Sequence, residues 1–200
     1  MRQLLLDFTR APAPTFDNFV PGGNAELLQA LQSAARGDPA ERVLYVWGEP
    51  GAGKSHLAQA FAEATAARVR VRVIDGIERL DEDAQAALFN DFIDRAFDVL
   101  LVTASAAPGQ LAIRRDLASR LATGVTYRVL PLTDEEKRAA LAAHARTRGF
   151  GLSEDVSSYL LTHARRDMGS LMATLDAIDQ YSLETGRPVT VPLLKAAMQA

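Results

Sequence analysis

The chain has 200 residues and no cysteine, which excludes disulfide scaffolds, thiol nucleophiles and cysteine-ligated metal sites. Its formal net charge of -3 disfavours tight autonomous binding to DNA, because domains that bind DNA alone usually carry a basic surplus. No apolar run approaches the ~20 residues of a membrane span, and no signal peptide is evident, so we expect a soluble, cytoplasmic protein.

Residues 1–14 combine a short apolar segment with a linker rich in proline and alanine, which favours extended backbone. From there strands alternate with helices, as is typical of an α/β domain with a parallel sheet. The predicted elements are a helix over 24–35, a strand over 42–47, a helix over 54–66, a strand over 69–75, a helix over 83–96, a strand over 98–104, a helix over 111–121 and a strand over 125–130.

The strand over 69–75 differs from the others in its pattern. Arginines at 68, 70 and 72 alternate with valines at 69, 71 and 73. Because successive side chains of a strand point to opposite faces, this alternation gives the strand one apolar and one charged face. Charged side chains on an edge strand also prevent it from pairing with strands of other molecules. We therefore expect this strand at the edge of the sheet.

After residue 130 the pattern becomes purely helical. Thr133 and Glu136 form a predicted capping box for a helix that ends near residue 147. Further helices are predicted over 153–165, over 167–184 and from about residue 190 onward. We thus expect three segments, namely a peptide with its linker over 1–14, an α/β core over 15–130 and a helical appendage over 131–200.

Residues 48–55 match the pattern G-x-x-x-x-G-K-[ST] at every fixed position, between a buried strand and a helix. Glycines allow backbone N–H groups to approach phosphate oxygens, and the helix N-terminus attracts the anion. We expect the lysine to reach the β- and γ-phosphates and the serine hydroxyl to ligate Mg²⁺. The candidate phosphate-binding residues are Gly48, Gly51, Ala52, Gly53, Lys54, Ser55 and His56.

A P-loop protein also needs an acidic residue at the end of another strand, to hold Mg²⁺ through water. Asp75 ends the strand over 69–75 and is our candidate. The next residue is Gly76, at a position where many P-loop ATPases carry a second acid that polarises the attacking water.

A P-loop core followed by a helical appendage resembles the AAA+ plan, and three segments resemble DnaA-type initiators. Residues 16–20 resemble the segment that wraps the adenine, which implies nucleotide contacts for Phe19 and Val20. Residues 116–121 resemble the arginine-finger box, which implies that Arg120 is the finger. Residues 129–137 and 148–152 resemble the start of the lid. The chain ends where that lid ends, so we expect the DNA-binding helix-turn-helix domain of the initiators to be absent.

The N-terminal segment fits the short Q-L-x-L-x-F peptide by which proteins dock on the bacterial sliding clamp. In this interpretation Gln3 and Leu4 belong to the docking peptide, and Leu6 and Phe8 enter the apolar pocket of the clamp. The structural alternative is an apolar segment that packs against the protein's own core.

The combination is similar to the Hda family, the regulatory inactivators of DnaA, over nearly the whole chain. The resemblance implies a negative regulator of replication initiation that binds ADP or ATP with Mg²⁺. Its implied partners are the initiator DnaA and the DNA-loaded sliding clamp, with a homodimer also possible. On the clamp it would stimulate hydrolysis of DnaA-bound ATP through an arginine finger in trans, which can be worth ~10³–10⁵ in rate.

Four departures from the family pattern change this expectation. About 30 residues, a strand and a helix, are missing before Asp75, so we expect the sheet to lack one edge strand. Gly76 replaces the second acid, Ser105 stands at the sensor-one position and Gly169 stands where the lid arginine is usual. We therefore expect nucleotide binding with weak or no intrinsic hydrolysis.

Two alternatives stay open at this point. One is a self-sufficient P-loop enzyme, an ATPase or a small-molecule kinase, which substantial turnover by the isolated protein would favour. The other is a helicase-loader-like AAA+ protein that grips single-stranded DNA, although the acidic balance and the lack of a basic or aromatic stripe disfavour it.

Overall fold

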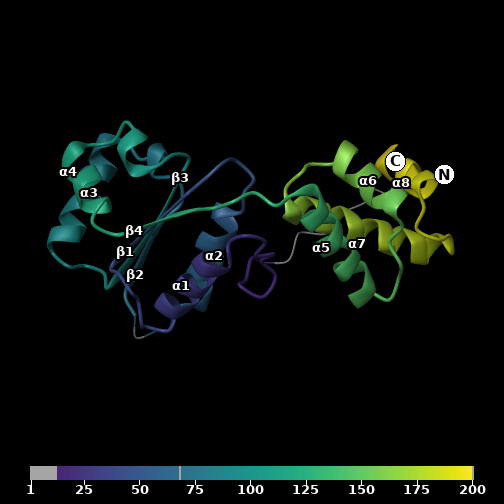
Figure 1. The fold of residues 1–200 in the computed structure, drawn as a ribbon, viewed down its shortest axis with the longest axis horizontal. Helices are drawn as coiled ribbons and strands as arrows, with labels where there is room; N and C mark the ends of the chain where they lie inside the picture. Colours follow the sequence, from purple (N-terminus) through teal and green to yellow (C-terminus); the bar gives the residue numbers. More distant parts are fainter. Residues whose placement is uncertain (1–12, 68, 200) are drawn as a thin grey trace. The chain divides into compact units, whose positions relative to one another are not determined.

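The structure is a computed structural model that describes residues 13–67 and 69–199, and it divides into two units. Residues 14–131 form an α/β unit, and a helical unit follows from residue 132. Figure 1 shows the two units, and each is described by itself below. The predicted clamp-docking residues Gln3, Leu4, Leu6 and Phe8 lie outside the described residues.

The α/β unit is built on a parallel sheet of four strands, which confirms the predicted fold class. The strands are β1 (Val43–Trp47), β2 (Val71–Ile74), β3 (Val99–Ala104) and β4 (Val125–Arg128), in the order β2-β3-β1-β4. β3 is buried along its whole length, whereas β2 lies at the edge and exposes Arg72 between two half-buried valines. The alternating charge on this strand therefore marked the sheet edge correctly.

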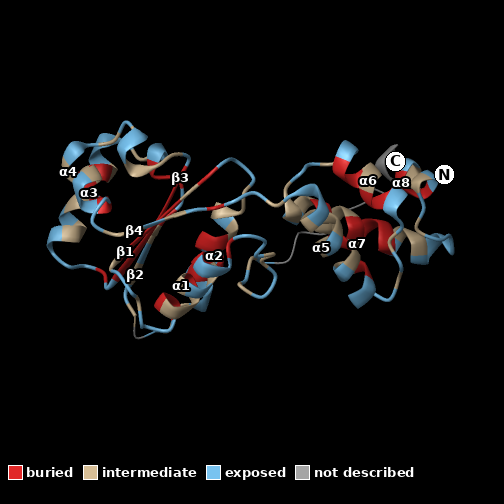
Figure 2. Cartoon of the chain, viewed as in Figure 1, coloured by how far each residue is buried: buried red, intermediate tan, exposed pale blue. Residues whose placement is uncertain are grey.

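Helices cover both faces of the sheet, as Figures 1 and 2 show. On one face lie α1 (Ala25–Ala35) and α2 (Lys54–Ala64), whose leucines pack with Leu44, Val46 and Leu101 from the strands. On the other lie α3 (Glu82–Ile93) and α4 (Arg115–Leu121), which pack on Tyr45 and Leu100. Short 3₁₀ turns, η1 (Ile77–Arg79) and η2 (Pro108–Gln110), follow β2 and β3.

The predicted helix over 111–121 is wrong at its start, because α4 begins only at Arg115. The buried Gln85 of α3 accepts a hydrogen bond from the backbone N–H of Arg114, at 2.9 Å. Because this bond gives the Arg114 N–H a partner outside the helix, residues 111–114 do not need to be helical. Leu111 and Ile113 pack against the core instead.

The helical unit contains α5 (Asp134–Thr147), α6 (Glu154–His163), α7 (Met168–Thr185) and α8 (Val191–Gln199). The predicted capping box is present, since the Thr133 hydroxyl accepts from the Glu136 N–H and the Glu136 carboxylate accepts from the Thr133 N–H. Leucines from all four helices form one core. None of the helices in the described part of the chain is long and apolar enough to cross a bilayer.

Candidate nucleotide-binding site

The loop over residues 48–53 connects the end of β1 to the first residue of α2. Gly51 and Gly53 have φ angles of 79° and 102°, which L-residues with a side chain rarely adopt. Gly48 has a different reason, because a Cβ there would lie 2.7 Å from the carbonyl oxygen of Val129. Gly51 and Gly53 thus allow the turns of the loop, and Gly48 allows the loop to pass close to the backbone of Val129.

The amino end of α2 is open to an anion. Its N-cap is Gly53, and no side chain caps the helix. The first N–H groups of an α-helix have no partner within the helix, and they carry the positive end of its dipole. Ser55 lies exposed in this first turn.

Lys54 folds over the loop, where its ammonium donates hydrogen bonds to the carbonyl oxygens of Gly48 at 2.8 Å and Glu49 at 2.9 Å. Burial lowers the pKa of this ammonium, while the carboxylates of Glu78 and Asp75 act in the opposite direction. The loop therefore holds a positive charge at its centre, and two carboxylates lie within electrostatic reach of it.

Asp75 directly follows β2, and a hydrogen-bonded side chain orients it. The Thr103 hydroxyl donates to Asp75 Oδ1 at 2.6 Å and accepts from the Gly76 N–H at 2.8 Å. Thr103 lies on β3, which separates β2 from β1 in the sheet. Because the carboxyl ends of parallel strands share one edge, Asp75 and the phosphate loop lie at the same edge of the sheet.

Two residues of this edge, Thr103 and Glu78, were not among the site residues predicted from the sequence. Thr103 is the polar residue inside an otherwise apolar strand, which was the available signal. Glu78 lies on the η1 turn after Gly76, whose φ of 77° turns the chain. Burial raises the pKa of the Tyr45 phenol and the Glu78 carboxylate raises it further, so Glu78 acts on both Tyr45 and Lys54.

The segment predicted to contact the adenine lies against the phosphate loop. The ring of Phe19 covers Gly53, where a Cβ would be only 2.9 Å from its edge. Phe19 also contacts His56 with ring centroids 5.5 Å apart, and His56 Nε2 lies 2.9 Å from the carbonyl oxygen of Thr15. His56 therefore ties this segment to α2, and Val20 is half-buried beside Phe19.

The donor set at this edge fits a nucleotide with Mg²⁺. Mg²⁺ prefers oxygen ligands and is usually held by one or two protein oxygens together with phosphates. Ser55 and Asp75 could supply such oxygens, and Lys54 with the open end of α2 could bind phosphates. No group of three or more acidic or histidine side chains in the described residues could hold a metal ion without the nucleotide.

Two of the predicted departures lie at the ends of β2 and β3. Gly76 follows Asp75 at the start of the η1 turn and has no side chain, and Ser105 is exposed directly after β3. In the helical unit Gly169 is exposed in the first turn of α7. These positions carry no charge that could act on a phosphate.

Arg120 lies in the last turn of α4, on the sheet face opposite to α2. Its side chain is exposed, and its guanidinium lies 5.9 Å from the centre of the Phe92 ring. Asp116 pairs with Arg114 at 2.7 Å instead. Among the described residues no carboxylate neutralises Arg120.

Comparison with known proteins finds two matching family models. One is described as an AAA domain and matches residues 36–153. The other is described as the lid domain of Hda and matches residues 134–198.

Solved structures of low sequence identity share the fold. Domain III of the Thermotoga maritima replication initiation protein DnaA is 19% identical with a TM-score of 0.74, covering 94% of this chain and 96% of that one. AMPPCP-bound DnaA from Aquifex aeolicus is 19% identical with a TM-score of 0.70, covering 86% and 67%. The Thermotoga maritima RuvB Holliday junction branch migration motor is 18% identical with a TM-score of 0.67, covering 93% and 71%.

Proposed function

Because this chain belongs to the AAA domain family and carries a lid similar to that of Hda, we propose that it is a cytoplasmic negative regulator of replication initiation. It binds ADP or ATP with Mg²⁺, docks on the DNA-loaded sliding clamp and stimulates hydrolysis of ATP bound to DnaA. It does not bind DNA tightly on its own, and a homodimer is compatible with this role.

The phosphate loop supports the nucleotide part of the proposal. The N–H groups at the start of α2 and the Lys54 ammonium bind the phosphates, and Ser55 with Asp75 holds Mg²⁺. Phe19, Val20 and His56 form the wall on the adenine side. The similar structure of DnaA from Aquifex aeolicus is AMPPCP-bound, and AMPPCP belongs to the same class of ligand.

The observation that carries the activating role is that no carboxylate of the described residues pairs with the Arg120 guanidinium. An arginine at a developing γ-phosphate charge lowers the barrier by electrostatic stabilisation, and removing it costs ~10³–10⁵ in rate in the best-known cases. Arg120 is exposed and lies on the sheet face opposite to α2, the helix that begins at the chain's own phosphate loop. This placement supports action on the nucleotide of a partner molecule.

Weak or absent intrinsic hydrolysis follows from the neutral Gly76, Ser105 and Gly169. The position of Glu78 favours the alternative of a self-sufficient ATPase, because this exposed acid lies on the η1 turn that follows Gly76, where the second acid is missing. Single-turnover hydrolysis by the isolated chain separates the two. Turnover that Glu78→Gln abolishes supports the ATPase, whereas nucleotide that stays intact on the wild-type chain supports the regulator.

The clamp and the finger are tested together by following hydrolysis of ATP bound to DnaA, with and without DNA-loaded clamp. The wild-type chain is expected to accelerate hydrolysis only with clamp, and Arg120→Ala to abolish the acceleration. Arg115→Ala, an exposed arginine of the same helix, is the matched control and should leave it intact. Gln3→Ala should weaken clamp binding while Thr9→Ala, outside the peptide motif, should not. Acceleration that does not depend on clamp contradicts the docking part of the proposal.

A further inference from the structure

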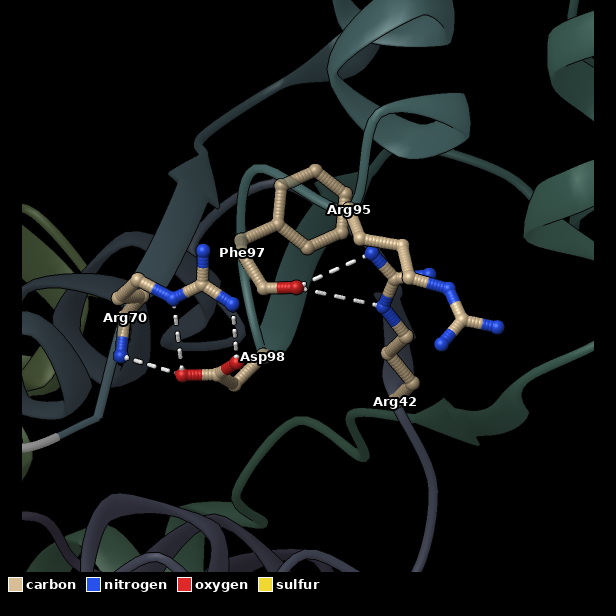
Figure 3. Close-up of a pocket in the computed structure, with 5 residues that line it drawn as sticks. All are labelled: Arg42, Arg70, Arg95, Phe97 and Asp98. Atoms are coloured by element: carbon tan, nitrogen blue, oxygen red, sulfur yellow. Dashed lines mark hydrogen bonds and ion pairs between the residues drawn. The ribbon is translucent and has the colours of Figure 1, made fainter.

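A hollow lined by three arginines lies at the amino ends of the strands, at the edge of the sheet opposite to the phosphate loop. Its volume is 420 Å³, and Figure 3 shows the residues that line it. They come from the segments that lead into β1, β2 and β3 and from the end of α3. The lining residues are Arg42, Arg70, Arg95, Phe97 and Asp98.

One of the three arginines is already neutralised. Arg70 Nη2 lies 2.7 Å from Asp98 Oδ1, and Arg70 Nε donates to Asp98 Oδ2 at 3.3 Å. This bidentate pair holds the pKa of the Asp98 carboxyl below its usual range, so Asp98 stays charged near neutral pH. The net charge of the lining is therefore +2, contributed by Arg42 and Arg95.

Arg42 is held in place while keeping free donors. Its Nε and Nη2 donate to the carbonyl oxygen of Phe97 at 3.3 and 3.0 Å. Its guanidinium also lies 4.8 Å from the Phe92 ring centre and 4.9 Å from that of Phe97. Two of the five N–H groups of the guanidinium thus donate to Phe97, and the other three make no hydrogen bond within the described part of the chain.

Arg95 occupies a backbone position that usually belongs to glycine. The Ala96 N–H donates to the Asp91 carbonyl at 2.9 Å and the Arg95 N–H to the Phe92 carbonyl at 3.4 Å. These are the two bonds of a Schellman motif, which places Arg95 at the C′ residue after α3. Its φ of 53° is the one positive φ of a non-glycine residue in the described part of the chain.

The side chain of Arg95 is exposed and has no hydrogen-bond or ion-pair partner among the described residues. Figure 3 shows its guanidinium on the Arg42 side of the Phe97–Asp98 segment, turned away from Asp98. An arginine at a position where glycine is less strained, with no internal partner, indicates a demand other than folding.

We propose that this hollow is a second anion site, which binds the dianion of a phosphoryl group between Arg42 and Arg95. A charge of -2 balances the +2 of the lining, and guanidinium groups bind phosphate oxygens bidentately. Because the phosphate loop lies at the opposite edge of the same sheet, both sites can be filled in one molecule.

The test is a titration of the full chain with inorganic phosphate, followed by NMR of the arginine Nε–Hε groups. The chain carries Lys54→Ala to weaken phosphate binding at residues 48–55. We expect one phosphate per chain with saturable shifts of the Arg42 and Arg95 signals. Phosphate that shifts no arginine signal, or shifts all exposed arginines alike, overturns the proposal.

Arg95→Gly separates binding from folding. Glycine relieves the positive φ, so the variant should melt at a higher temperature than its parent without phosphate, yet bind phosphate at least tenfold more weakly. The matched control is Arg72→Ala, an exposed arginine on β2 that does not line the hollow, which should bind as its parent does. Unchanged affinity in Arg95→Gly refutes the site.

A second arm identifies the carrier of the phosphoryl group. If 5′-AMP binds with the same arginine shifts and more tightly than inorganic phosphate, a mononucleotide is the ligand, and if both bind equally, the free anion is sufficient. Either result supports a phosphoryl site. A glutamate-rich peptide that binds where phosphate does not would instead make the hollow a protein-docking surface and overturn the proposal.

Discussion

Replacing Thr103 by valine should weaken both the fold and the Mg²⁺-dependent binding of nucleotide. Valine has nearly the same shape but lacks the hydroxyl that joins Asp75 to the Gly76 N–H. Thr103 is 1% exposed and Gly76 is buried, so no water replaces the lost bond to the N–H. Asp75 is exposed and can turn to solvent, which removes its fixed orientation.

The expected cost can be assembled from these contacts. An unsatisfied buried N–H costs about 1–3 kcal/mol, and the lost hydrogen bond to Asp75 about 1 kcal/mol. The additional buried methyl group returns about 0.8 kcal/mol. The net loss of about 1–3 kcal/mol corresponds to a fall in Tm of roughly 4–12 °C for a domain of this size. Losing the group that orients a metal-binding carboxylate typically costs about 10–100-fold in metal affinity.

Urea unfolding and ADP titrations with and without Mg²⁺ measure the two effects separately. Thr103→Ser is the matched control, because it keeps the hydroxyl and removes only a methyl group. Its Mg²⁺-dependent affinity should equal that of the wild type. Equal affinities of Thr103→Val and Thr103→Ser for Mg²⁺–ADP would show that the Thr103 hydroxyl does not orient Asp75.

Two further substitutions test the packing of the loop and the electrostatics at the sheet edge. Gly48→Ala should lower the free energy of unfolding by about 1–3 kcal/mol, because its Cβ would lie 2.7 Å from the Val129 carbonyl oxygen. The control Gly109→Ala has open space around the new Cβ, so it should change this free energy by less than about 0.5 kcal/mol. Urea unfolding measures both variants, and equal effects would contradict a steric clash at residue 48. Arg70→Ala should destabilise the chain near neutral pH, because Arg70 lowers the pKa of Asp98 in the folded state. The stabilisation from this pair is present above the unfolded-state pKa of about 3.9, and it is lost as the pH falls through the lower pKa of the folded state. Unfolding at pH 7 and about pH 2 checks this, and a difference that persists in acid assigns the effect to packing.

The edge position of β2 and the placement of the phosphate loop could be predicted because they depend on local patterns. Arg72 between two valines indicates a strand with one solvent-exposed face. Residues 48–55 contain the glycines that the turns of a phosphate loop require. Strands that alternate with helices pair in parallel, so Asp75 lies at the same edge of the sheet as the phosphate loop.

Other features depend on which segments meet in space. The partnership of Thr103 with Asp75 follows from the register of β3 against β2, which no local pattern reveals. The late start of α4 depends on Gln85 of another helix. The predicted helix over 83–96 ends at Ile93 instead, because Arg95 takes the left-handed position where a glycine would have signalled the end.

We propose that Arg120 acts on ATP held by DnaA, and the fate of labelled ATP on DnaA shows whether it does. Radiolabelled ATP is loaded on DnaA and mixed with this chain on DNA-loaded clamp, in wild-type, Arg120→Ala and Arg120→Lys forms. We expect labelled ADP on DnaA with the wild type and none above background with alanine. We expect a strongly reduced rate with lysine, because lysine keeps the charge but loses the planar guanidinium. An alanine variant that converts the ATP of DnaA as fast as the wild type would contradict it.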